Sequence, residues 1–224
     1  MRVAAVLLDI DGTLLDSNDA HARAWVETGE ELGYAIRFDA VRPLIGMGGD
    51  KVLPMLTGLA EESAEGQRVL ARRGQIFRER HLASCEPFPG VQDLLARMGR
   101  DGLELVIATS ASGDDLKALV ERAGIGDLID GATHADEAEE SKPDPDIVHA
   151  ALKRAGEPAD RAVMIGDTPY DVEAARNAGV RIIAVRCGGW WNDADLSGAD
   201  AVYDDPAAIL RDYPASLSGG GRGG

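Results

Sequence analysis

Two acidic residues follow the first apolar run of the chain. Residues 3–8 are apolar, and Asp9 and Asp11 come directly after them in the stretch VAAVLLDIDGTLLDS. Two carboxylates at the end of a buried segment repel each other unless a cation lies between them. Gly12 follows at once and can adopt the backbone angles of a tight turn. This stretch therefore predicts a turn that presents two acids to a cation.

Polar residues also follow later segments of the chain. Three of these segments carry Thr109, Ser110 and Ser112 after LELVIA, Lys142 in ESKPDPD, and Asp167 and Asp171 in GDTPYD. Each residue taken alone could form a turn or cap a helix. In open parallel sheets, however, ligands bind at the carboxyl ends of the strands, where all of these residues would meet. Ligands that are all oxygen suit Mg²⁺, so we expect a magnesium and phosphate site.

The elements that would carry these residues alternate between strand and helix. Apolar runs at 3–8, 103–108, 162–165 and 180–185, with a further candidate at 131–133, read as strands buried on both faces. Helical patterns lie between them at 91–100, 114–123, 145–155 and 171–178. This order predicts an α/β fold, a doubly wound parallel sheet of Rossmann-like type.

Residues 16–85 interrupt that alternation. They contain no strand-like run and are expected to form helices at about 19–32, 39–44, 49–56 and 61–83. We therefore expect an α/β core made of residues 1–15 and 86–214, with an inserted helical cap domain at 16–85. The last residues, 215–224, are rich in glycine and are expected to form a flexible tail.

Composition limits the possible partners. Apolar residues make up 45% of the 224 residues, and 39 acids against 23 bases give a net charge of −16. Such a charge repels nucleic acid and anionic lipid, so neither is expected as a partner. Apolar runs stay well below the roughly 18 residues of a membrane span, and Asp9 and Asp11 interrupt any signal-peptide pattern. A cytoplasmic location is expected, with Cys85 and Cys187 reduced.

The polar segments together resemble a known set of motifs. In order, DIDGTLLDS, ATS, SKPDP and GDTPYD resemble the four motifs of the haloacid dehalogenase superfamily of phosphotransferases. The helical insert resembles that superfamily's small α-helical cap. The dehalogenase branch lacks an acid at the position of Asp11, whereas phosphatases and phosphomutases have one. The resemblance therefore favours phosphoryl transfer over dehalogenation.

The resemblance implies a role for each acid of the first motif. Asp9 would be the nucleophile that attacks phosphorus and becomes an aspartyl phosphate. Asp11 would protonate the leaving group and then activate water. Its side chain would therefore stay free of the metal, while its backbone carbonyl would be a metal ligand.

The other motifs receive supporting roles by the same resemblance. Thr109 would hydrogen-bond the phosphoryl oxygens, with Ser110 beside it as a substrate-binding residue. Lys142 would neutralise charge on the nucleophile and the phosphoryl group. Asp167 would complete the Mg²⁺ site with Asp9, and Asp171 would support the metal from outside its ligand shell.

Cap residues are expected to choose the substrate. His21 and Trp25 share one helix face, and His21 could lie over the site or be incidental to an amphipathic helix. A histidine at this place resembles the family's sugar-phosphate mutases. Lys51 follows a glycine-rich loop and could meet a substrate anion or remain solvated. The stretch VRCGGWW is expected to serve packing or surface contact, with no catalytic role.

Three functions fit these residues. The first is a Mg²⁺-dependent phosphatase of phosphoglycolate phosphatase-like type, acting on a small phosphorylated metabolite. The second is a β-phosphoglucomutase-like isomerase, which would use the same aspartyl phosphate but return the phosphoryl group to the sugar. The third is a non-catalytic phosphate-binding module, which would have no need of Asp11.

Overall fold

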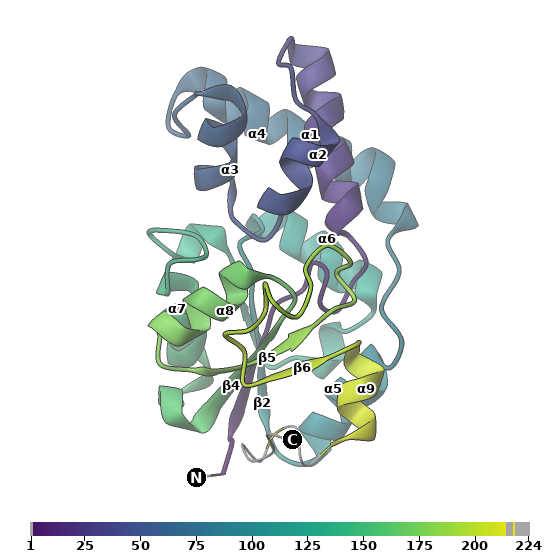
Figure 1. Cartoon of the computed structure of the whole chain (residues 1–224), viewed down its shortest axis with the longest axis vertical. Coiled ribbons are helices and arrows are strands. Elements are labelled where there is room, and N and C mark those ends of the chain that lie inside the picture. The colour runs from purple at the N-terminus through teal and green to yellow at the C-terminus, as the bar shows by residue number, and fades with distance from the viewer. Residues whose placement is uncertain (1, 214–216, 218–224) are drawn as a thin grey trace.

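The computed structural model describes residues 2–213 and residue 217, and its centre is a parallel sheet (Figure 1). Six strands pair in the order β3-β2-β1-β4-β5-β6. Their bounds are β1 Ala5–Leu8, β2 Glu104–Ala108, β3 Gly131–Thr133, β4 Ala162–Gly166, β5 Arg181–Val185 and β6 Ala201–Tyr203. The doubly wound α/β fold expected from the sequence is confirmed.

Strand β1 lies at the middle of the sheet because it is apolar on both faces. Val6 and Leu8 belong to one buried cluster, and Ala5 and Leu7 belong to another on the opposite side. Leu8 is paired in register with Ile107 of β2 and with Ile165 of β4. The residues that follow these three strands therefore emerge together at one edge of the sheet.

Helices cover both faces of the sheet. The first buried cluster includes residues of α5 (Val91–Arg100), α6 (Gly113–Ala123) and α9 (Pro206–Arg211), and the second includes residues of α7 (Asp146–Ala155) and α8 (Pro169–Asn177). Short 3₁₀ turns occupy Gly126–Leu128, Ala135–Glu137 and Ala159–Arg161. Strand β6 and helix α9 were not anticipated, because both elements are short and none of the three residues of β6 is fully buried.

The helical insert lies at the carboxyl edge of the sheet (Figure 1). It consists of α1 (Asn18–Leu32), α2 (Phe38–Val41), α3 (Gly49–Thr57) and α4 (Ala64–Ile76), with 3₁₀ turns at Arg42–Leu44 and Leu82–Ser84. These helices bury an apolar cluster of their own around Trp25, Val41 and Leu53. A separate apolar cluster is what a cap domain needs, although its boundaries stay predictions.

The single helix expected at 61–83 is shorter and less regular than the sequence indicated. It begins at Ala64 and is capped by Ser63, whose side-chain oxygen accepts a hydrogen bond from the backbone N–H of Gly66. After Ile76 the chain widens into a π-helical turn, η2 (Phe77–His81), and then tightens into the 3₁₀ turn. From the wide turn, Phe77 stacks on His21 and Arg78 contacts Asp115 of α6, so both side chains face the sheet edge.

The two passages between insert and sheet run side by side. Leu15 forms an isolated bridge with Pro87, and the backbone N–H of Asp16 donates to the carbonyl of Glu86 over 2.9 Å. The expected flexible tail at 215–224 lies outside the described residues except for Leu217, whose carbonyl oxygen accepts a hydrogen bond from Arg181. Among the described helices, none has the length and apolar character needed to cross a bilayer.

The core packing predicts the cost of a buried truncation. Leu95 on α5 is fully buried, so Leu95→Ala should lower the free energy of unfolding by about 3 kcal/mol. Met55 on α3 is 64% exposed, so Met55→Ala should change it by less than about 0.5 kcal/mol. Urea titration followed by circular dichroism measures both. Equal effects of the two substitutions would contradict this core assignment.

Candidate active site

Three buried carboxylates meet at the carboxyl edge of the sheet. Ligand atoms of Asp9, Asp167 and Asp171 all lie within 4.8 Å of one another. Asp9 follows β1 and Asp167 follows β4, so the register of these neighbouring strands places them together. The fully buried ammonium of Lys142 lies 2.7 Å from Asp9 Oδ1 and 2.7 Å from Asp171 Oδ1. One lysine thus bridges two of the three acids.

This cluster holds more negative charge than its lysine can balance. Burial raises the pKa of Asp9 to about 7, against the opposing effect of Lys142. Burial, with repulsion from Asp9 and Asp171, raises the pKa of Asp167 well above its usual value. The neighbouring carboxylates raise the pKa of Lys142 in spite of its burial, so its charge is retained. Three carboxylates with one ammonium leave about two uncompensated charges, which fits a divalent metal site.

Hydrogen bonds orient the carboxylates of Asp9 and Asp167. The Thr13 hydroxyl lies 3.0 Å from Asp9 Oδ2 and 3.3 Å from Asp167 Oδ1, and its single proton can serve only one of them at a time. Asn18 donates its side-chain N–H to Asp167 Oδ2 over 2.8 Å. These hydrogen bonds restrain the two carboxylates at the place where a cation would bind.

Two glycines make room for the Asp167 carboxylate. A Cβ built on Gly188 would lie 1.8 Å from Asp167 Oδ2, and one built on Gly12 would lie 2.2 Å from the same atom. Gly12 also has a φ of 75°, in the left-handed region. A side chain at either position would force Asp167 out of the cluster.

Asp171 has a supporting position. Its Oδ2 accepts hydrogen bonds from the backbone N–H and the hydroxyl of Thr168, while the Thr168 hydroxyl accepts one from the Asp171 N–H. This reciprocal capping box begins helix α8. Because one carboxylate oxygen is committed to the helix cap and the other to Lys142, Asp171 fits the expected role outside the metal's ligands, which stays a prediction.

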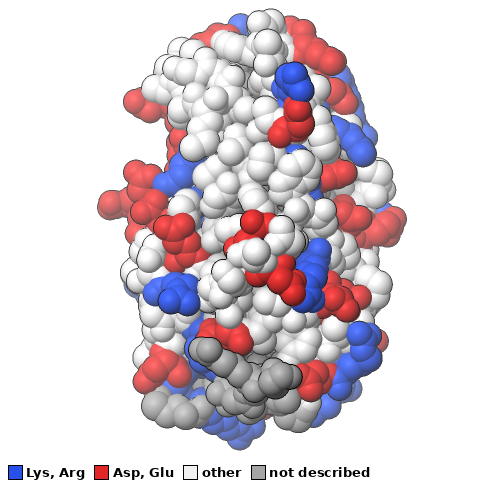
Figure 2. All heavy atoms as spheres, viewed as in Figure 1, with Lys and Arg blue, Asp and Glu red and all other residues white. Residues whose placement is uncertain are grey.

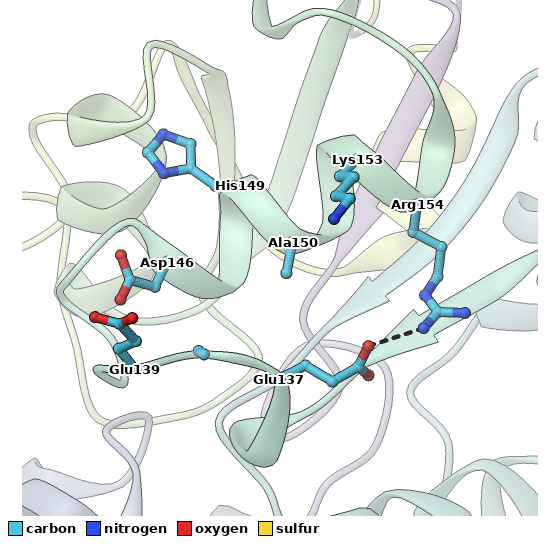
Figure 3. Close-up of a pocket in the computed structure, with 8 residues that line it drawn as sticks. Glu137, Glu139, Asp146, His149, Ala150, Lys153 and Arg154 are labelled. Carbon is cyan, nitrogen blue, oxygen red and sulfur yellow. Dashed lines mark hydrogen bonds and ion pairs between the residues drawn. The ribbon is translucent and has the colours of Figure 1, made fainter.

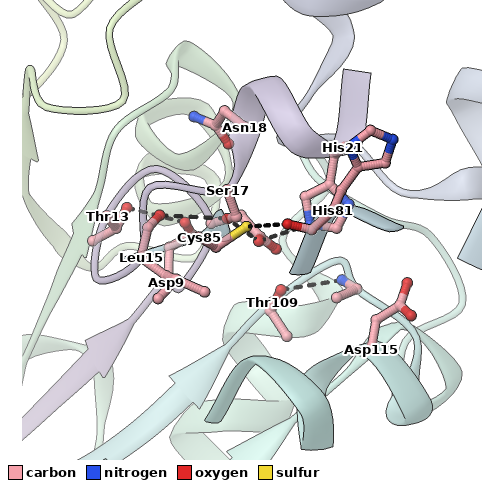
Figure 4. A network of polar contacts seen from close by, with 12 residues as sticks. Asp9, Thr13, Leu15, Ser17, Asn18, His21, His81, Cys85, Thr109 and Asp115 are labelled. Atoms are coloured by element: carbon pink, nitrogen blue, oxygen red, sulfur yellow. Dashed lines mark hydrogen bonds and ion pairs between the residues drawn. The ribbon is translucent and has the colours of Figure 1, made fainter. Parts of the chain in front are cut away.

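Asp11 differs from Asp9 because its carboxylate has other partners, Ser17 and His21, which are both labelled in Figure 4. Its Oδ1 accepts a hydrogen bond from the Ser17 hydroxyl and lies 2.8 Å from Nε2 of His21 on α1. The His21 ring stacks on Phe77 at a centroid distance of 3.8 Å. Burial would raise the pKa of Asp11, but His21 and the Ser17 hydrogen bond outweigh it, so the pKa lies below its usual value. Asp11 is thus a separate titrating group beside the cluster.

A cavity of about 410 Å³ connects these groups with the helical insert. Asp9, Asp11, Thr109 and Ser110 line it from the sheet edge, and His21 lines it from α1. The Thr109 hydroxyl accepts a hydrogen bond from the N–H of Ala111 over 3.1 Å, while the buried Ser110 hydroxyl has no hydrogen-bond partner among the described residues. An unpartnered buried hydroxyl at this place is suited to receive a ligand oxygen.

Lys51 lies away from this cavity. Its ammonium is 3.1 Å from Glu140 Oε2 and 2.6 Å from Asp144 Oδ2, and it is not among the lining residues. Nearby, the backbone N–H of Gly48 donates to the Ser141 hydroxyl over 2.9 Å. The structure therefore places Lys51 against the loop that carries Lys142 rather than among the cavity residues.

Two basic residues of the cavity wall were not anticipated from the sequence. Arg73 and Arg78 line it from α4 and η2, and both contact the buried carboxylate of Asp115 on α6. The local stretch ARRGQIFRER shows only a basic helical segment, typical of a solvated face. Only the approach of the insert to α6 reveals which of its arginines face the cavity.

A second hollow of about 690 Å³ contains none of the expected site residues (Figure 3). It lies between the 135–137 turn and α7, and its charged side chains include Glu137 paired with Arg154 over 2.8 Å. The tryptophans of VRCGGWW also lie apart from the cavity lining, with Trp190 exposed and near Arg42. The acid cluster and the 410 Å³ cavity therefore remain the candidate site.

A family model and curated relatives agree on the family to which this chain is similar. The family of haloacid dehalogenase-like hydrolases matches residues 6–185. A phosphoglycolate phosphatase of Caulobacter vibrioides is 30% identical over 227 residues, covering 96% of this chain and 96% of that protein.

Solved structures agree with the fold. The crystal structure of a hydrolase from Pseudomonas syringae superposes with a TM-score of 0.88 at 27% identity, covering 96% of this chain and all of that one. A β-phosphoglucomutase from Clostridium difficile superposes with a TM-score of 0.82 at 19% identity, covering 96% of each chain. At that identity the second likeness concerns the fold alone.

The close approach of Gly188 to the Asp167 carboxylate predicts a specific effect of substitution on metal binding. Gly188→Ala should displace Asp167 and weaken divalent-cation binding about tenfold or more, as measured by isothermal titration calorimetry. Gly99→Ala is the matched control, because a Cβ on Gly99 meets nothing within 4 Å. The control should bind the cation like the wild type and gain slight stability in helix α5. Unchanged affinity in Gly188→Ala would argue against Asp167 as a ligand.

Proposed function

This chain belongs to the haloacid dehalogenase-like hydrolase family and is a phosphatase of that family, and we propose that it hydrolyses a small phosphorylated metabolite with Mg²⁺ and an aspartyl-phosphate intermediate. The observation that carries this proposal is the different surroundings of two acids in one turn. Asp9 is paired with Lys142 inside the buried cluster, and Asp11 contacts His21 beside it. Both acids line the same cavity.

The donor set suits magnesium. Asp9 and Asp167 would hold the ion through carboxylate oxygens, with the backbone carbonyl of Asp11 as a further ligand, and Asp171 would support the site through Lys142 and Thr168. When bound, Mg²⁺ supplies charge neutralisation for the acids and for the phosphoryl oxygens.

The first chemical step belongs to Asp9. A carboxylate oxygen of Asp9 attacks phosphorus, the bond from phosphorus to the ester oxygen breaks, and Asp11 gives that oxygen a proton. Lys142 offsets the repulsion between the Asp9 carboxylate and the anionic phosphoryl group. Thr109 and Ser110 hydrogen-bond the phosphoryl oxygens from the end of β2.

The second step returns the enzyme to its starting state. Water attacks phosphorus of the aspartyl phosphate, Asp11 takes its proton, and inorganic phosphate leaves with Asp9 restored. The lowered pKa of Asp11 keeps its carboxylate ionised, so that it can accept a proton in this step. An incoming phosphate dianion would raise that pKa by repulsion, so that Asp11 can carry the proton needed in the first step.

His21 is the positioning residue for Asp11. It reaches Asp11 from α1 while its ring is held by stacking on Phe77. Because α1 and η2 both belong to the helical insert, the approach of the insert completes the surroundings of Asp11. The protein surface carries both positive and negative side chains on the face shown in Figure 2. Because the net charge of the chain is −16, an anionic substrate needs cations close to it in the site, such as Lys142.

A phosphomutase would use the same acidic residues of this cavity. It would also need a cavity that excludes water during transfer back to the sugar. The His21–Asp11 contact serves either reaction. In both reactions Asp11 gives a proton to the ester oxygen and then takes one from the attacking group, which is water in a phosphatase and a sugar hydroxyl in a phosphomutase. The phosphatase remains our proposal, and product identity separates the two.

Replacing each acid should separate the two steps. With p-nitrophenyl phosphate and Mg²⁺, Asp11→Asn should release about one equivalent of nitrophenol in a burst and then turn over roughly a hundredfold or more slower, since this leaving group needs no acid but the second step needs a base. Asp9→Asn should show no burst and lose about a thousandfold or more in turnover. Stopped-flow absorbance measures both. A binding module without catalysis would show no turnover in the wild type.

Product analysis decides between phosphatase and mutase. Incubation with β-glucose 1-phosphate and Mg²⁺ should yield inorganic phosphate if this ester is accepted at all. Phosphate release and glucose 6-phosphate are measured in the same sample. Glucose 6-phosphate accumulating without phosphate would refute the phosphatase proposal and support the mutase.

A further inference from the structure

Two arginines of the helical insert share one buried carboxylate in the cavity wall. Arg73 Nη1 lies 2.6 Å from Asp115 Oδ2, and Arg78 Nη1 contacts Asp115 Oδ1. The Asp115 side chain is 1% exposed, near the start of α6, where its N–H donates to the Ser112 hydroxyl. The nucleophile role of Asp9 makes no use of this group, although all three charged side chains line the same cavity as Asp9.

The three charges do not cancel. Two guanidinium groups and one carboxylate give this group of three side chains one net positive charge. Among the described residues that line the cavity, Arg73 and Arg78 are the only lysine or arginine side chains. Glu61, Asp114 and Asp136 line the cavity as well, but none of them pairs with either arginine in the described part of the chain.

Arg73 keeps donors free for a ligand. Asp115 engages only one of its terminal nitrogens, while its buried Nε has no hydrogen-bond acceptor among the described residues. The guanidinium lies 5.8 Å from the Trp25 ring centroid and 6.0 Å from that of Phe77, contacts that favour a fixed orientation. A guanidinium that is held in place and only partly hydrogen-bonded is suited to bind a planar or tetrahedral anion.

The position of Arg73 relative to Asp11 and His21 indicates which part of the substrate it could bind. Phe77 stacks on His21, and His21 contacts Asp11, so Arg73 lies one side chain away from the acid–base pair. In the proposed mechanism the reacting phosphate is bound by Asp9, Thr109 and Ser110, whereas the two arginines line the cavity from α4 and η2. An anion on the arginines is therefore a different group of the same small molecule.

We propose that Arg73 and Arg78 bind a second anionic group of the substrate, a carboxylate or a second phosphate, and that Asp115 positions the two guanidiniums for it. This inference rests on the phosphatase function proposed above. It narrows the substrate to small phosphate esters that carry another negative charge near the ester. Lys51, which is paired with Glu140 and Asp144, is not part of this anion site.

The test compares esters that differ only in the second group. The probes are 2-phosphoglycolate, its neutral counterpart 2-hydroxyethyl phosphate, and ethylene glycol bisphosphate, with kcat and KM measured for each. Wild-type protein should prefer at least one doubly anionic ester by roughly tenfold or more in kcat/KM. Which of the two it prefers separates a carboxylate from a second phosphate.

The variants locate the preference. Arg73→Gln and Arg78→Gln should each raise KM for the preferred ester by about tenfold, with kcat changed far less, and should leave KM for 2-hydroxyethyl phosphate within about twofold. Arg73→Lys should raise KM less than Arg73→Gln does, because lysine keeps the positive charge but lacks the planar set of donors of a guanidinium. Arg72→Gln is the matched control: Arg72 is the adjacent residue of α4, but it pairs with Glu31 and does not line the cavity.

The outcomes are distinct. A wild type that hydrolyses none of the esters, nor p-nitrophenyl phosphate, would overturn the proposed phosphatase and this inference with it. A wild type that hydrolyses all esters equally well would keep the phosphatase and overturn the anion site. Equal losses for charged and neutral esters in Arg73→Gln and Arg78→Gln would mean that the arginines only fasten the insert to α6, which also overturns the anion site.

Discussion

The ion pairs of the buried Lys142 with Asp9 and Asp171 are the constraint on which this structure depends. Both contacts are 2.7 Å long, and no part of the lysine side chain is exposed. A buried ammonium is stable only where carboxylates surround it, and buried carboxylates are stable only where cations do. Since Asp167 adds a third acid, the cluster favours binding a divalent cation. The capping box of α8 and the Gly188 contact then serve to hold these charges in place.

A second feature is the separation of two acids that lie only two residues apart. The turn that follows β1 directs Asp9 toward the sheet edge and Asp11 toward Ser17 and His21. Asp9 is therefore surrounded by groups of the α/β core, whereas Asp11 has a partner from the helical insert. The insert also contacts the lysine's loop, where Ser141 accepts a hydrogen bond from Gly48 and donates its own N–H to Asp50. Both acid sites are thus sensitive to where the insert sits.

Sequence patterns predicted the parts of the fold whose signal is local. The apolar runs of β1, β2, β4 and β5 and the glycine after α6 were sufficient to place those elements within about two residues. Strand β6 was missed because its three residues are only partly buried and leave little apolar pattern. The long helix expected at 61–83 was wrong beyond Ile76, because helical periodicity does not distinguish an α-helix from the π-helical turn that follows.

The acids, the lysine and their order along the strand ends can be read from local sequence, because parallel strands bring their carboxyl ends to one edge whatever their exact register. Which side chains of the insert reach that edge depends on how the insert packs against the core. Lys51 and Arg73 are both cations in helical segments, and nothing in their local sequence separates them. Packing turned Lys51 toward Glu140 and Asp144 and turned Arg73 into the cavity against Asp115. That choice depends on contacts between residues more than forty positions apart, which local patterns do not encode.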